Sequence, residues 1–149
     1  MTEENKEVQE EVTAKEKPKA KPKKKEVVAN EFFSARELRC KHTGKDGFDA
    51  DFLELLTKIR IECDFPFAIS SAYRDKSHPA EQGKSGMGSH SMGKAVDVLC
   101  RGEKALKLIE VAQKHGIKRI GVQQRGLSRF IHIDSCTEAD GKPPAIWSY

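Results

Sequence analysis

The sequence contains no apolar run that approaches the ~20 residues a helix needs to cross a bilayer, which argues against a membrane span. It also lacks an export signal at its start. The first residues, MTEENKEVQEEV, are acidic and polar, whereas a secretory signal has a basic flank and an apolar stretch. We therefore expect no signal peptide.

Closely spaced cysteine pairs are absent as well. The four cysteines, at positions 40, 63, 100 and 136, are separated by 23, 37 and 36 residues, so there is no CxxC motif. This spacing argues against a thiolate zinc ribbon and against a thioredoxin-type redox motif. Without an export signal, we expect reduced thiols rather than a disulfide framework.

Residues 1–28 have almost no apolar side chains. Residues 1–12 carry five Glu and one Lys, whereas residues 13–25 carry seven Lys and one Glu. Because such a segment cannot offset its ordering entropy by burial, we predict a disordered tail at 1–28 and one folded domain at 29–149. The Lys-rich block fits either a solvated spacer or a weak contact with a polyanion or a virion protein.

Helical periodicity occurs in two segments of the domain. One helix is predicted over about 50–63, capped by Asp49 or Asp51, because its apolar residues recur every three to four positions. A second is predicted over about 103–115, followed by Gly116. Ser34 and Glu37 form the sequence pattern of a capping box, which predicts a short helix before both.

Four short β-prone runs lie between and after these helices, at residues 67–71, 94–100, 118–123 and 129–134. Short strands combined with two longer helices are typical of an α+β domain. We predict a small, mainly antiparallel sheet with the two main helices packed on one face. The polar, glycine-rich segment 75–93 is long for a structureless loop, and such loops are usually functional or mobile.

Two of the predicted strands carry charged or titratable residues among apolar ones. Asp97 lies within KAVDVLC, and a buried carboxylate needs a cation, a donor network or a metal. In RFIHID, His132 and Asp134 alternate with two isoleucines, so one face of the strand is apolar and the other polar. His90 precedes Asp97 by seven residues in SHSMGKAVD, and Gly93 permits a tight turn between them.

His90, Asp97 and His132 together supply two imidazoles and one carboxylate. Three protein ligands with an open fourth position are typical of a catalytic zinc site. A metal held in this way polarises a carbonyl and acidifies water, which suits amide hydrolysis.

The segments SAYR, SHSMGKAVD and FIHID, followed by Trp147, resemble the zinc D-Ala-D-Ala carboxypeptidase family over about residues 31–148. That family includes phage endolysins and murein endopeptidases, and shares its core with the hedgehog signalling domain. The resemblance implies Zn²⁺ on His90, Asp97 and His132, and Arg74 reaching the carboxylate of the substrate. We expect Ser89 to contact substrate too, while Trp147 either stacks on substrate or covers the core.

One position departs from the family pattern. Many members have a Glu or Asp general base three residues before the last histidine ligand, where this chain has Arg129. Asp134 is the best remaining candidate for the base, and Arg74 the second catalytic residue. Alternatively, Asp134 accepts a hydrogen bond from a ligand histidine and fixes its tautomer.

Two functions are therefore consistent with the sequence. The first is a monomeric zinc peptidase that cuts the stem peptide or cross-link of bacterial peptidoglycan, as a phage lysis or virion-associated muralytic protein. Such a protein would be in the host cytoplasm until lysis gives it access to the wall, or in the virion. The second is a catalytically impaired module with the same fold that binds wall peptides or a partner protein.

Overall fold

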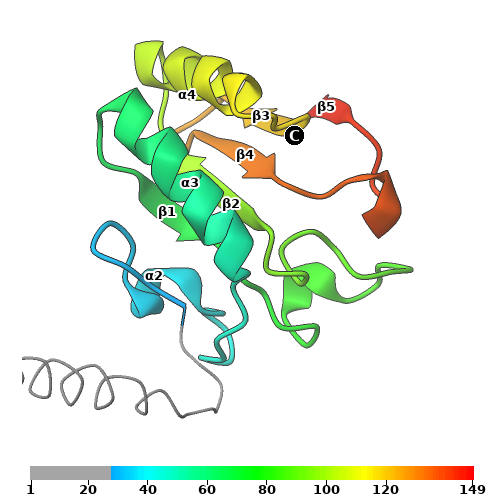
Figure 1. Cartoon of the computed structure of the whole chain (residues 1–149). Coiled ribbons are helices and arrows are strands. Elements are labelled where there is room, and N and C mark those ends of the chain that lie inside the picture. Colours follow the sequence, from blue (N-terminus) through cyan, green and yellow to red (C-terminus); the bar gives the residue numbers. More distant parts are fainter. Residues whose placement is uncertain (1–27) are drawn as a thin grey trace, which may run out of the picture.

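The computed structural model describes residues 28–149 (Figure 1). The disordered tail predicted for 1–28 thus lies outside the described residues, apart from Val28. The helices are α2 (Ala35–Leu38), α3 (Ala50–Cys63) and α4 (Glu103–Lys114), with short 3₁₀ helices η2 (Pro79–Glu81) and η3 (Glu138–Asp140). The strands are β1 (Ala68–Ser71), β2 (Ala95–Leu99), β3 (Arg119–Gln123), β4 (Phe130–Asp134) and β5 (Ala145–Ser148).

Helices α2 and α3 begin at side-chain caps. Ser34 and Glu37 form the predicted capping box at α2, with Glu37 N donating to Ser34 Oγ at 3.2 Å and Ser34 N donating to Glu37 Oε1 at 2.9 Å. Of the two cap candidates for α3, Asp49 is the one that accepts a hydrogen bond from Phe52 N, at 2.9 Å. These bonds satisfy amide groups that have no partner within the helix.

The five strands form one sheet in the order β1-β2-β4-β3-β5. Neighbouring strands are antiparallel except β3 and β5, which run parallel. The predicted α+β class with a mainly antiparallel sheet is therefore confirmed. Strand β5 was not predicted, because it is short, largely exposed and directly preceded by two prolines that favour reading the segment as a turn.

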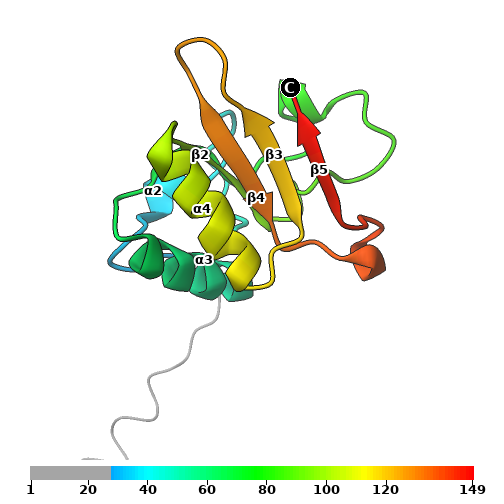
Figure 2. The same ribbon diagram turned by 90° about the horizontal axis from the view of Figure 1, so that it is seen from above.

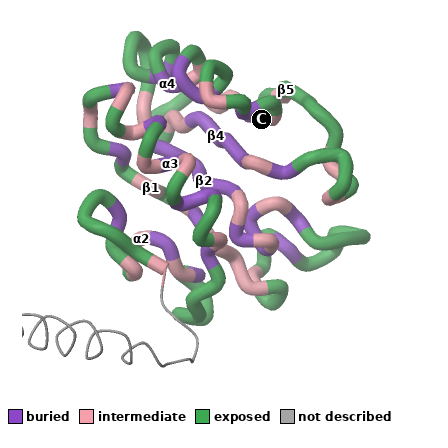
Figure 3. The backbone as a smooth tube through the Cα atoms, viewed as in Figure 1, coloured by how far each residue is buried: buried purple, intermediate pink, exposed green. Residues whose placement is uncertain are grey.

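Helices α3 and α4 lie on one face of the sheet (Figure 2). Four apolar side chains of β2 and β4, Val96, Val98, Ile131 and Ile133, are fully buried in the core, and Figure 3 colours most of both strands as buried. Burying each such side chain stabilises the fold by about 1.5–3 kcal/mol. The main residues at this interface are Leu56, Ile59, Val96, Val98, Leu108, Val111, Ile131 and Ile133.

The opposite face of the sheet carries a row of residues in register across all five strands. Ser71 pairs with Asp97, Asp97 with His132, His132 with Gly121, and Gly121 with Trp147. Because paired residues point to the same face, this register places a carboxylate, an imidazole and an indole side by side. No helix within residues 28–149 is long and apolar enough to span a bilayer.

Candidate metal centre

His90 is presented by a turn that is fastened to the end of β1. Its Nδ1 lies 2.7 Å from the carbonyl oxygen of Ala72, and Arg74 N donates to the carbonyl of His90 at 3.1 Å. A carbonyl can only accept, so Nδ1 must carry the proton, which leaves Nε2 with its lone pair free. Gly93, at φ +76°, closes the turn where a Cβ would lie 2.1 Å from the carbonyl oxygen of Gly47.

Asp97 and His132 meet His90 at one point. Asp97 Oδ1 lies 3.3 Å from His90 Nε2 and 3.0 Å from His132 Nδ1, and the three ligand atoms all lie within 4.8 Å of one another. Bonds of about 2.0–2.1 Å in a tetrahedral zinc site put neighbouring ligand atoms about 3.3 Å apart. The buried donor set therefore fits a zinc ion in both chemistry and spacing.

The charge states of His90 and Asp97 suit metal binding. Burial lowers the pKa of His90, which favours the neutral imidazole that a metal requires. Burial alone would raise the pKa of Asp97, but the imidazoles of His132 and His90 that face its carboxylate outweigh burial and hold that pKa well below its usual range. Asp97 is thus an anion facing two imidazoles.

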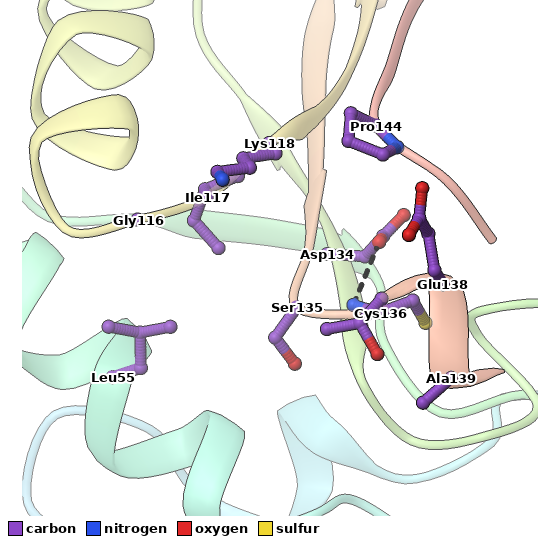
Figure 4. A pocket seen from close by; sticks show the side chains of 11 residues that line it. Leu55, Gly116, Ile117, Lys118, Asp134, Ser135, Cys136, Glu138, Ala139 and Pro144 are labelled. Carbon is purple, nitrogen blue, oxygen red and sulfur yellow. Dashed lines mark hydrogen bonds between the residues drawn. The ribbon is translucent and has the colours of Figure 1, made fainter.

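Asp134 contacts the other side of the His132 ring. Its Oδ2 accepts from His132 Nε2 at 2.7 Å, and its carboxylate also accepts from Arg119 Nε at 2.9 Å and from Cys136 N at 3.1 Å. The side chain is fully buried, and it borders a separate cavity of about 710 Å³ (Figure 4). These contacts favour the tautomer-fixing role, because a proton on Nε2 leaves Nδ1 to face Asp97.

Arg74 lies beside the centre, and its guanidinium is already engaged by the protein. It donates from Nε to Ser71 Oγ at 3.0 Å and from Nη1 to Glu81 Oε2 at 3.1 Å, while Nη2 lies 3.6 Å from Asp97 Oδ2. Glu81 is itself buried and also pairs with Lys84. Arg74 thus forms an ion pair with Asp97. Its role in substrate binding stays a prediction.

A family model described as Peptidase M15 matches residues 31–134, which cover most of the chain. The chain belongs to the Peptidase M15 family. A search of curated proteins found no match. Membership places the chain among zinc metallopeptidases, and the three candidate ligands lie within the matched region.

A cleft of about 730 Å³ lies at the candidate metal centre. Two parts of the chain that are distant in sequence contribute most of its lining: residues 84–90 on one side, and residues 140–142 with Trp147 and Tyr149 on the other. All three predicted substrate-binding residues, Arg74, Ser89 and Trp147, are among the lining side chains. The structure therefore brings together the predicted ligands and substrate-binding residues, whereas Asp134 borders only the other cavity.

Trp147 packs over the centre because Gly121 leaves room for it. Its ring lies 5.1 Å from the His132 ring and 5.1 Å from the guanidinium carbon of Arg119. A Cβ on Gly121 would lie only 2.6 Å from the indole nitrogen. Because Trp147 lines the cleft, its position favours stacking on substrate over covering the core, and the role in substrate binding stays a prediction.

Sequence reasoning missed Arg119 and Gly121 as parts of this site. Arg119 lies directly opposite Asp134 in the β3–β4 pair, and Gly121 lies opposite Trp147. Only the strand order places these two residues at the centre.

Replacing Gly121 by Ala is expected to displace the indole of Trp147 from His132. Trp147 is the one tryptophan of the chain, so its intrinsic fluorescence reports its surroundings directly. We expect a shifted emission maximum and a higher KM for peptide substrates, because the wall of the cleft moves. Gly86→Ala is a matched control for the spectrum, since a Cβ there meets no atom within 4 Å and its φ is not positive. An unchanged Gly121→Ala spectrum would contradict this packing.

Proposed function

We propose that this chain is a zinc-dependent peptidase that hydrolyses a peptide bond in the stem peptide or cross-link of bacterial peptidoglycan. The observation that carries the proposal is the convergence of three buried donors, all within 4.8 Å of one another, beside a cleft of about 730 Å³. Zinc bound there would polarise the scissile carbonyl and make water acidic enough to attack near neutral pH.

We assign His90, Asp97 and His132 as the metal ligands. Asp134 and Arg119 act on His132, since their ion pair fixes the ring and its tautomer. Trp147 covers one side of His132 and limits the access of bulk water. Arg74 holds Asp97 and Glu81 in place, and Ser89 offers a hydroxyl in the cleft where a peptide would lie.

At a finer level, we propose a phage lysis or virion-associated muralytic protein. In this reading, residues 29–149 are the catalytic domain, acting as a monomer. The Lys-rich block at 13–25 then provides weak contact with an anionic wall polymer or a virion protein, an electrostatic contact that added salt would screen.

A second candidate function is a peptide-binding module without catalysis. Arg129 occupies the usual place of the general base, and its Nε donates to the carbonyl of Gly126 at 2.9 Å. Within residues 28–149, the carboxylates that line the cleft are Asp97 and Asp140, and Asp140 is bound by Lys94 at 3.3 Å. Neither is an unengaged proton acceptor, which favours the binding module.

Digestion of purified peptidoglycan separates the two functions. A peptidase should release soluble peptides whose masses identify the cut bond, and a chelator should stop the release. The matched control is the same digestion by His132→Ala, which keeps the cleft but lacks one ligand. Retention of the protein on the wall with no new peptide masses, with zinc present, would favour the binding module instead.

A further inference from the structure

Within residues 28–149, the cleft contains one charged side chain that has no partner of opposite charge. Its other charged lining residues all have partners of opposite charge: Arg74 and Lys84 pair with Glu81, Arg119 with Asp134, and Asp140 with Lys94. Lys142 lines the same cleft, and no carboxylate within residues 28–149 lies within ion-pair or hydrogen-bond distance of its ammonium.

Hydrogen bonds also fix the backbone of the turn that carries Lys142. Its amide donates to the carbonyl of Thr137 at 3.0 Å, and Gly141, at φ +78°, donates to the carbonyl of Glu138 at 2.9 Å. On its other side, Arg119 Nη1 donates to the carbonyl of Pro143 at 2.7 Å. The turn that carries Lys142 is therefore anchored to η3 and to the sheet, and its side chain is only half-exposed.

We propose that Lys142 binds a carboxylate of the peptide substrate and so makes the site selective for anionic peptides. The inference rests on the proposed function, since it names the substrate feature that the same cleft recognises. Arg74 is the less suitable partner, because Ser71, Glu81 and Asp97 already engage its donors. A half-buried ammonium that no carboxylate of residues 28–149 neutralises gains most from a ligand that supplies the missing charge.

A wall stem peptide has two kinds of carboxylate that fit this description. One is the terminal carboxylate of D-Ala, and the other is the free α-carboxylate of γ-linked D-Glu. Both present the same chemistry to Lys142, so three forms of L-Ala-γ-D-Glu-L-Lys-D-Ala-D-Ala distinguish them: the free acid, the C-terminal amide, and the form amidated at the α-carboxylate of glutamate.

Calorimetric titration of each peptide into the full chain, with metal removed so that no peptide is cut, tests the proposal. We expect wild-type protein to bind the free acid about 10-fold or more tightly than one of the amides. Lys142→Glu, and the milder Lys142→Gln, should lose that preference. Lys58→Glu, an exposed charge reversal on α3, should keep it.

The amide that loses affinity identifies which carboxylate is bound. Equal binding of all three peptides by wild-type protein, binding of none, or an unchanged preference in Lys142→Gln would each overturn the proposal. Hydrolysis by the zinc-loaded chain is scored separately. If peptides bind selectively but none is cut, the peptidase function fails while the role of Lys142 stands.

Discussion

Asp97→Ala protein is expected to lose zinc binding and peptide hydrolysis together. Asp97 Oδ1 faces both imidazoles, so its removal leaves two histidines that no longer share a third ligand. Structural zinc sites bind with about 10–16 kcal/mol over four ligands, so losing one should weaken binding by about 10²–10³-fold. Wild-type protein should contain about one zinc per chain by elemental analysis.

Thermal unfolding gives an independent measure of the same loss. Added zinc should raise the Tm of wild-type protein, because the ion binds the folded chain. Added zinc should leave the Tm of Asp97→Ala nearly unchanged. Asp46→Ala, which removes an exposed acid in the loop before α3, should respond like wild type. Full zinc content in both Asp97→Ala and His132→Ala would rule out this ligand assignment.

Asp134→Asn should weaken zinc binding by about 10–100-fold, the usual cost of removing a group that orients a metal ligand. The variant keeps the shape of the side chain but loses the charge that holds His132 Nε2 and Arg119. Because Asp134 is fully buried, the change should also reduce the free energy of unfolding by about 3 kcal/mol. Zinc titration and chemical denaturation measure the two effects.

Glu138→Gln is the matched control for Asp134→Asn. Glu138 borders the same cavity (Figure 4) but is exposed. The Glu138→Gln protein should therefore keep the zinc affinity and the free energy of unfolding of the wild type. A different outcome would support the role of general base for Asp134: wild-type zinc affinity with a rate about 10²–10⁴-fold lower. That result would contradict the positioning role favoured by the contacts.

The candidate ligands could be found in the sequence because most of their geometry is local. His90, Gly93 and Asp97 lie within eight residues, and the alternation in β4 puts His132 on the polar face of its strand. Helix α3 was predicted at its observed bounds because its apolar spacing and its cap agree. In each case, residues close in sequence determine the structure.

The parts that sequence reasoning missed depend on pairing between distant strands. Asp134 lies opposite Arg119 only because β4 lies between β2 and β3, and no local pattern fixes that order. Likewise, Trp147 reaches His132 only because β5 pairs in parallel with β3 across Gly121. The sequence therefore leaves both roles for Asp134 open, and its contacts across the sheet favour the positioning role.

The most direct test of the central claim is zinc titration of metal-free protein while peptidoglycan hydrolysis is followed by mass spectrometry. The account predicts that peptide release is absent at the start, rises in proportion to added zinc and reaches a plateau at about one zinc per chain. Under the same conditions, the His132→Ala protein should stay inactive when one equivalent of zinc per chain has been added. Peptide release by metal-free protein that added zinc does not increase would contradict the account.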